Sequence, residues 1–323
     1  LLESRGLGDV YKRQGGNTSI KSDGRMLIKA SGTWLINSLD KDIFVEVDLN
    51  SISEKINNGK EDNFIDDIIS KNNLHPSSET SFHALINRKY VLHVHSTATI
   101  ANAISQSSGF DLRKYLDEDF IFVPYCRPGF TLTMEIKKLI LPSTNILVLE
   151  NHGLIVAGDD IEDTYKLLLK IHEKLDLIRN EKLGLDYPEK ITNIGGYIHK
   201  NTDKYKLFST QNEKLFSLFS KSFYPDHVIF LGPGIPTFLE VKEANEFIQN
   251  LKKKNINLPP YLILKYKGLF ENTLAIPAAK EMIDCFLEVL LRIDLSKSLK
   301  FLSSQQESEL LNWDIEIYRQ SIN

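Results

Sequence analysis

Three histidines have the residue type and the spacing of a metal site. His93 and His95 stand two residues apart in the largely apolar run 90–95, and His152 follows a second apolar run, 146–149. Because successive side chains of a β-strand point to opposite faces, His93 and His95 project to the same side of a strand. Three histidine ligands leave one position of a tetrahedral zinc ion open, which is typical of catalytic zinc. The spacing of His93 and His95 alone is better interpreted as two histidines of a protein core. The predicted zinc site therefore depends on the motifs around this pair.

Three loops of small and hydroxyl-bearing residues indicate a place for an anion. They lie at 15–19 (Gly-Gly-Asn-Thr-Ser), 30–33 (Ala-Ser-Gly-Thr) and 76–79 (Pro-Ser-Ser-Glu). Small residues let backbone N–H groups approach an anion closely, and a helix start adds further donors. Each loop by itself is more typical of a turn. Together the three loops predict a place where a phosphate could be held.

Glu79 is the candidate acid/base. It follows Ser77 and Ser78 at the start of a helix predicted over 78–87, which places it in the first helical turn. A carboxylate beside a metal ion can carry a proton to and from a substrate carbon. The alternative is a charge that caps the helix and takes no part in chemistry.

Alternating strands and helices must position these residues. Hydrophobic patterns and turn residues predict strands at 26–29, 44–47, 90–95, 121–123 and 145–149, and helices at 64–70, 78–87, 97–105, 133–141 and 161–180. In the 90–95 strand, Leu92 and Val94 are predicted to face the core behind the histidines. Such a mixture predicts a three-layer α/β domain. A second region is predicted with strands at 227–231 and 261–265 and helices at 242–252 and 277–293.

This pattern predicts four segments along the chain. Residues 15–183 form the α/β domain, 184–204 a connector with Pro188, Gly195 and Gly196, and 205–323 a smaller α/β accessory region. Residues 1–14 carry no clear period and are predicted to lie outside the domain.

Composition limits the classes of partner. The 323 residues are 42% hydrophobic and 25% charged with a net charge of −4, as in a soluble globular protein without nucleic acid or membrane as partner. No apolar run has the length of a membrane span. The two cysteines, Cys126 and Cys285, lie far apart and are predicted to be buried thiols, which favours a cytoplasmic location.

Taken in order, the five motifs resemble the class II aldolase/adducin family over about residues 15–180. They are Gly-Gly-Asn-Thr-Ser, Ala-Ser-Gly-Thr, Pro-Ser-Ser-Glu-Thr, His-Val-His and Asn-His-Gly-Leu. The resemblance implies an α/β/α fold around a mixed, mainly antiparallel sheet. It implies Zn²⁺ or another divalent metal on His93, His95 and His152, with Glu79 as acid/base. It also implies that five loop residues bind phosphate: Asn17, Ser31, Gly32, Ser77 and Ser78. It also implies a homo-oligomer, usually a tetramer, with the metal at a subunit interface.

Two parts of the chain stand apart from these motifs. Residues 1–14 do not resemble the family. The segments 225–228 and 313–320 resemble its longer members.

The function that this resemblance implies is that of a zinc-dependent aldolase, a lyase that acts on a small sugar phosphate. It would cleave a ketose phosphate or related hydroxy-keto compound by a retro-aldol step through an enediolate. Three alternatives stay open: a pentulose-phosphate 4-epimerase, another aldol-type lyase and an adducin-like interaction module without catalysis. Such epimerases usually carry Asp where this chain has Glu79, and adducin-like modules have typically lost metal ligands, so both features favour the aldolase.

Overall fold

The protein folds into two compact units. The computed structural model describes residues 15–61, 63–105, 108–185 and 194–313. Of these, the first unit contains the residues up to Asp176 together with Trp313, and the second contains Leu177–Asn312. The predicted non-family stretch 1–14 and the tail segment 314–320 lie outside the described residues, as does part of the predicted connector. The boundaries predicted at 183 and 205 stay predictions.

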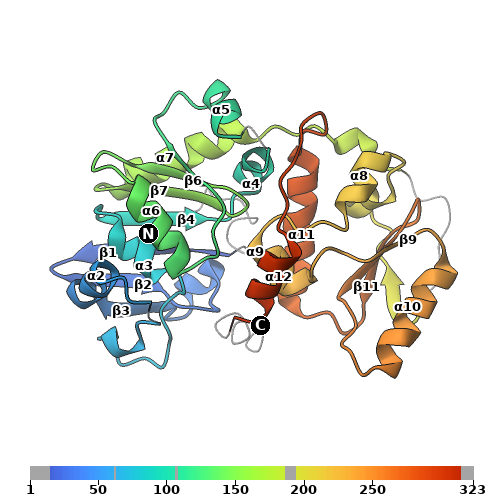
Figure 1. Cartoon of the computed structure of the whole chain (residues 1–323), viewed down its shortest axis with the longest axis horizontal. Helices are drawn as coiled ribbons and strands as arrows, with labels where there is room; N and C mark the ends of the chain where they lie inside the picture. Colours follow the sequence, from blue (N-terminus) through green and yellow to red (C-terminus); the bar gives the residue numbers. More distant parts are fainter. Residues whose placement is uncertain (1–14, 62, 106–107, 186–193, 314–323) are drawn as a thin grey trace. The chain divides into compact units, whose positions relative to one another are not determined.

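A seven-stranded sheet is the centre of the first unit, in the order β3-β2-β1-β4-β7-β6-β5 (Figure 1). Only β5 and β6 pair in parallel; the other neighbours are antiparallel. The strands are β1 (Gly16–Ser22), β2 (Arg25–Lys29), β3 (Phe44–Asp48), β4 (Tyr90–Val94), β5 (Ile121–Val123), β6 (Ile146–Leu149) and β7 (Gly153–Gly158). The helices are α2 (Leu49–Asn57), α3 (Thr80–Leu85), α4 (Thr97–Ala103), α5 (Ser108–Asp111), α6 (Phe130–Leu139) and α7 (Ile161–Leu175), with 3-10 turns η1 (Leu35–Leu39), η2 (Ile65–Asp67) and η3 (Leu112–Lys114).

Helices cover both faces of this sheet. On one face, Leu92 and Val94 of β4 pack in one cluster with residues of α4 and α7. On the other face, Val91 packs with α3 and α6, and β2 and β3 pack with α2. The strand alternation therefore places His93 on the face that carries α3, with Leu92 and Val94 in the opposite core. The predicted three-layer α/β fold with a mixed, mainly antiparallel sheet is confirmed.

Helix α7 shows how local sequence builds a layer. Asp160 caps its start by accepting a hydrogen bond from the backbone N–H of Asp163. Leu168, Ile171 and Leu175 recur at helical spacing and are buried against the sheet. The helix ends at Leu175, earlier than the predicted 180.

Two glycines let the strands on either side of β4 approach it closely. Gly16 of β1 has φ +106°, and a Cβ built there would lie 2.6 Å from the carbonyl oxygen of His93. Gly153 of β7 has φ +153°, and its Cβ would lie 2.4 Å from the carbonyl oxygen of Val94. A side chain at either position would push a strand away from the histidines.

A four-stranded sheet in the order β8-β11-β10-β9 forms the second unit's framework. The strands are β8 (Tyr197–His199), β9 (Thr237–Phe238), β10 (Tyr261–Leu264) and β11 (Gly268–Asn272). The helices are α8 (Glu213–Leu218), α9 (Pro225–Leu231), α10 (Val241–Lys253), α11 (Pro277–Arg292) and α12 (Ser304–Leu311), with 3-10 turns η4 (Glu181–Leu183) and η5 (Asp203–Ser209). The smaller α/β region is thereby confirmed in fold class. Within the described ranges, no helix is long and apolar enough to cross a membrane.

Three predicted elements are wrong. The loop predicted at 15–19 is largely the first part of strand β1, which pairs with β2 and β4. The run 227–231 is not a strand but most of α9, which begins with Pro225 at its first turn. A short apolar run that is buried on every side has no period that separates strand from helix. The predicted helix at 64–70 is only the 3-10 turn η2, after which Ile69 and Ser70 donate backbone hydrogen bonds to Glu46 of β3.

Candidate functional site

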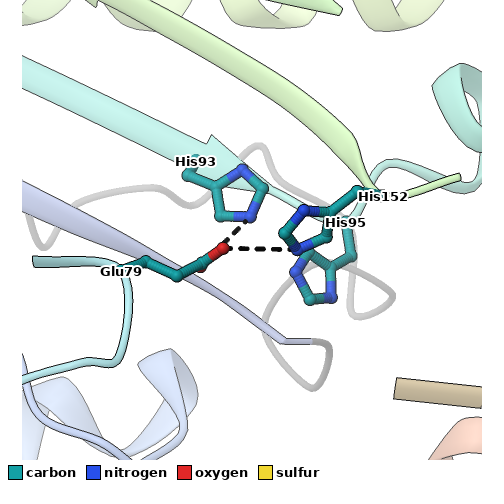
Figure 2. A group of neighbouring side chains, drawn as sticks. All are labelled: Glu79, His93, His95 and His152. Carbon is teal, nitrogen blue, oxygen red and sulfur yellow. Dashed lines mark ion pairs between the residues drawn. The ribbon is translucent and has the colours of Figure 1, made fainter. Parts of the chain in front are cut away.

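Four buried side chains converge at the end of β4 in the first unit: Glu79, His93, His95 and His152. Each offers one potential metal-ligand atom, and these atoms all lie within 4.8 Å of one another (Figure 2). The three imidazole ring centroids are 4.9–5.0 Å apart. The structure thus brings together every metal ligand predicted from the sequence, although they come from separate segments of the chain.

Each histidine reaches this point from a different local structure. His93 is paired with Ile155 of β7 and Asn17 of β1 in the interior of the sheet. His95 lies one residue beyond the last residue of β4. His152 lies in the tight turn between β6 and β7, after Asn151 at φ +55°. Asparagine tolerates this left-handed conformation better than most residues, which lets the turn place His152 over the end of β4.

The backbone selects the tautomer of His93. Its Nδ1 lies 3.1 Å from the carbonyl oxygen of Leu154, which can only accept a hydrogen bond, so Nδ1 carries the proton. The lone pair of His93 is therefore on Nε2, the nitrogen that faces Glu79. A hydrogen bond of this kind commonly orients metal-binding histidines.

The Glu79 carboxylate lies between two imidazoles. Its Oε2 is 3.4 Å from Nε2 of His93, and its Oε1 is 3.3 Å from Nε2 of His152 (Figure 2). A charge-assisted hydrogen bond is shorter, at roughly 2.7–2.9 Å. Two ligands of one tetrahedral zinc ion, each about 2.0–2.2 Å from the metal, lie roughly 3.4 Å apart. The nitrogen and oxygen set therefore fits a divalent metal ion.

Glu79 does not stand in the first turn of α3, as predicted, but at the N-cap position before Thr80. Helix α3 begins only at Thr80, because the backbone N–H and the hydroxyl of Thr80 both donate to the carbonyl oxygen of Ser77. The Glu79 side chain makes no capping hydrogen bond. Its Oε2 instead accepts one from Nδ2 of Asn17 at 2.8 Å.

Hydrogen bonds join the three polar segments, which are the start of β1 and the loops at 30–33 and 76–79. Ser31 donates its backbone N–H to the carbonyl oxygen of His75 at 2.9 Å, next to a β-bridge between Ala30 and Pro76. Asn17 donates from Nδ2 to Oγ of Ser77 at 2.9 Å. The predicted phosphate-binding residues Asn17, Ser31, Gly32, Ser77 and Ser78 therefore belong to three neighbouring segments.

One of these hydroxyls has the property expected of an anion ligand. Oγ of Ser31 is buried and has no hydrogen-bond partner among the described residues. Buried hydroxyls are nearly always hydrogen-bonded, so this atom is suited to a ligand oxygen.

Two buried residues that the sequence analysis did not select, Ser19 and His83, adjoin the site. Nδ1 of His83 lies 2.7 Å from Oγ of Ser19, and its Nε2 contacts Oδ1 of Asn17. Burial is the main cause that holds the pKa of His83 well below its ordinary value of 6.5. Three nearby side chains act in the same direction: His93, Lys21 and Lys29. The four-residue spacing from Glu79 to His83 was the available signal, since it places both on one side of a helix start.

Comparison with known sequences gives one family match. The sequence profile described as the Class II Aldolase and Adducin N-terminal domain matches residues 6–177, more than half of the 323 residues. Among curated proteins, the chain is 28% identical over 190 residues to "Uncharacterized oxidoreductase YuxG" of Bacillus subtilis (strain 168). That match covers 53% of this chain and 27% of YuxG, so the chain matches about a quarter of that relative's length.

Two solved structures are each similar to about half of the chain. The N-terminal class II aldolase domain of a conserved protein from Thermoplasma acidophilum is 24% identical, with 51% of this chain and 84% of that chain covered and a TM-score of 0.47. The l-fuculose-1-phosphate aldolase from Thermus thermophilus is 16% identical, with 51% and 82% covered and a TM-score of 0.37.

Proposed function

The chain belongs to the class II aldolase and adducin family, and from this premise we propose that it is a zinc-dependent aldolase. Its substrate class is a ketose phosphate or related hydroxy-keto compound, cleaved between two carbons by a retro-aldol step. The observation that carries the proposal is the buried Glu79 carboxylate, which lies against His93 and His152 and is held by Asn17. A carboxylate with a purely structural role has no need of three converging imidazoles.

The role of each residue follows from the donor set. His93, His95 and His152 would hold the metal, which when bound supplies Lewis-acid stabilisation of the negative charge that develops on oxygen as the carbon–carbon bond breaks. Glu79 carries a proton from the substrate hydroxyl that becomes the aldehyde carbonyl to the carbon that is left with the electron pair, and carries it back in the synthetic direction. Burial of all four side chains keeps water from competing for this proton.

A phosphate group on the substrate would be bound by the three joined polar segments. Ser77 Oγ accepts from Asn17 and from the backbone N–H of Glu79, so its own proton remains available to donate to a phosphate oxygen. The buried hydroxyl of Ser31 supplies a second donor. Ser78 and Gly32 complete the proposed group. Binding at these loops fixes the substrate's reacting end relative to Glu79.

The location, the assembly and the partners of the protein are proposed from its family. We expect a cytoplasmic homo-oligomer, a tetramer in the simplest case, with the metal site at a subunit interface and no nucleic acid or membrane as partner. Light scattering of the purified protein tests the assembly. A stable monomer with full activity would contradict it.

Metal analysis combined with a cleavage assay tests the function. The wild type is expected to contain one divalent metal per chain and to release an aldehyde and a hydroxy-ketone phosphate from a member of a ketose 1-phosphate panel. His95→Ala should lose both properties, whereas His75→Ala, which changes an exposed histidine, should keep them. Equal metal content in His95→Ala and the wild type would remove the metal assignment.

The competing functions give different results in the same assay. Interconversion of two pentulose phosphates without net release of aldehyde identifies an epimerase. Cleavage of an unphosphorylated acid identifies another aldol-type lyase. Absence of metal and of all turnover identifies an interaction module.

A further inference from the structure

A continuous hydrogen-bonded chain of buried side chains ends on the proposed acid/base. Oγ of Ser19 lies 2.7 Å from Nδ1 of His83, Nε2 of His83 contacts Oδ1 of Asn17, and Nδ2 of Asn17 donates to Oε2 of Glu79 at 2.8 Å. All four side chains are buried, and none of these residues is more than 4% exposed. A buried polar chain that is satisfied at every link gives its members one fixed geometry.

Strand alternation and one helical turn build this chain. Asn17 and Ser19 are two residues apart on β1, so both point to the same face of the sheet. Their partners on β4 are His93 and Val91, and Val91 packs against α3. His83 on α3 lies over both β1 residues, with one ring nitrogen on each. One imidazole therefore satisfies both side chains at once.

Donor and acceptor rules fix the direction of every hydrogen bond. Oδ1 of Asn17 can only accept, so Nε2 of His83 carries the proton. Nδ1 of a neutral His83 then accepts from the hydroxyl of Ser19. The amide group of Asn17 is thereby oriented with its two N–H bonds on Glu79 Oε2 and Ser77 Oγ, and rotation of the amide by 180° would place oxygen against the carboxylate.

From this geometry we infer that His83 is a positioning residue for the acid/base. Acting through Asn17, it holds Oε2 of Glu79, so that Oε1 is the oxygen that exchanges the proton with substrate. The inference rests on the proposed function for the role of Glu79, but the tautomer and the orientation of Asn17 do not depend on it. Asn17 is then a link between the acid/base and Ser77 of the phosphate-binding loops.

Nitrogen-15 spectroscopy of the metal-free protein tests the geometry without any substrate. In histidine-labelled protein, two-bond ¹H–¹⁵N correlations distinguish the Nε2–H tautomer, the Nδ1–H tautomer and the cation. The His83 signals, assigned by their loss in His83→Gln, are expected to show the neutral Nε2–H form across neutral pH. An Nδ1–H form would overturn the inference, because its bare Nε2 cannot donate to Oδ1 of Asn17, whereas a cation would still donate from Nε2.

Turnover of three variants tests the role. The amide of His83→Gln can replace Nε2–H, whereas the shorter His83→Asn can replace only Nδ1 and His83→Leu replaces neither. His83→Asn and His83→Leu should lower kcat by about 10- to 100-fold with metal content and KM little changed, and His83→Gln should restore most of the loss. The matched control is His199→Leu, which removes a buried histidine bonded to the carbonyl oxygen of Lys267 in the second unit and should leave kcat unchanged.

The outcomes separate the two proposals. Equal kcat in His83→Gln, His83→Asn and the wild type would overturn the positioning role. If His83→Leu fails to fold, the Gln and Asn variants still decide, since both carry an amide. A wild type that turns over no ketose phosphate overturns the proposed aldolase alone, and the tautomer measurement then decides the geometry.

Discussion

Both units of the protein bury histidines, but the surroundings of these histidines differ. In the first unit, three imidazoles converge on a carboxylate, and backbone and side-chain hydrogen bonds set the tautomer and the orientation of the group. In the second unit, His227 of α9 lies among aromatic rings, with its ring centroid 4.6 Å from that of Phe286 and 5.7 Å from that of Tyr224. Neither nitrogen of His227 has a hydrogen-bond partner among the described residues.

The difference shows that burial alone does not make a site. Burial lowers the pKa of His227 to about 3, and this is its single cause. His227 is therefore a neutral core residue, despite standing beside Asp226 in the sequence. The histidines at β4 differ because other elements bring ligand atoms to them. Convergence from separate elements, rather than residue type, distinguishes a candidate site from a core histidine.

The largest expected effect is the fall in kcat when the Glu79 carboxylate is replaced. Glu79→Gln keeps the size of the side chain and the three histidines, so we expect metal to be retained while kcat falls by roughly 10²–10⁴-fold, the usual contribution of one general acid/base. Zinc content and cleavage rate are measured on one preparation. Asp67→Asn is the matched control, because this buried carboxylate is bonded to Lys55 and Ser51 instead. If zinc is lost with activity, Glu79 is a required ligand.

A substitution at Gly153 should disturb the close approach of β7 to β4, which brings the metal-ligand atoms together. An alanine there combines a positive φ with a Cβ 2.4 Å from the carbonyl oxygen of Val94, so we expect roughly 3 kcal/mol of destabilisation and weaker metal binding. Gly59→Ala has φ +68° and open space around its Cβ, and should cost only about 1 kcal/mol. Urea unfolding of both variants measures the difference. Equal costs would mean that the close approach of β7 to β4 does not matter.

Zinc should distinguish the two kinds of histidine through thermal unfolding. A ligand at 100 times its Kd stabilises the folded state by about 2.7 kcal/mol, so zinc should raise the Tm of the wild type. The rise should be absent in His93→Ala and retained in His227→Leu. A zinc-induced rise in Tm of equal size in His93→Ala would contradict this difference between the two units, since zinc would then bind elsewhere.

Lowering the pH should destabilise the second unit through protonation of His227. The unfolded chain binds a proton near the ordinary pKa of 6.5, whereas the folded chain binds it only near 3. The unfolded state therefore holds more protons below 6.5, and stability is lost as pH falls from 6.5 towards 3. At pH 5 this amounts to about 2 kcal/mol for a fully buried group. Denaturant unfolding at pH 7.5 and pH 5 should show this loss in the wild type and a smaller one in His227→Leu.

Prediction from the sequence worked best where a period and a turn residue agreed. The strands at 26–29, 44–47 and 121–123 are present with bounds within one residue, because polar or turn residues end each run. The failures lie where local signals conflict. The run 227–231 is apolar at almost every position, and only the packing of α9 against α11 and α12 decides that it is helical. Glu79 was predicted two positions too far into its helix because the turn at Ser77 is set by hydrogen bonds from Thr80.

The sequence by itself determined which side chains share a face and which chemistry they can perform. The period of two places His93 on the same side as His95, whatever the rest of the fold. Only the tertiary structure decided that β1 and β7 flank β4, that the turn after β6 carries His152 to the same point, and that His83 joins Asn17 to Ser19. The physical reason is that periodicity is local to one element. Pairing between elements depends on how the whole sheet buries its two faces and on glycines that let neighbouring strands approach.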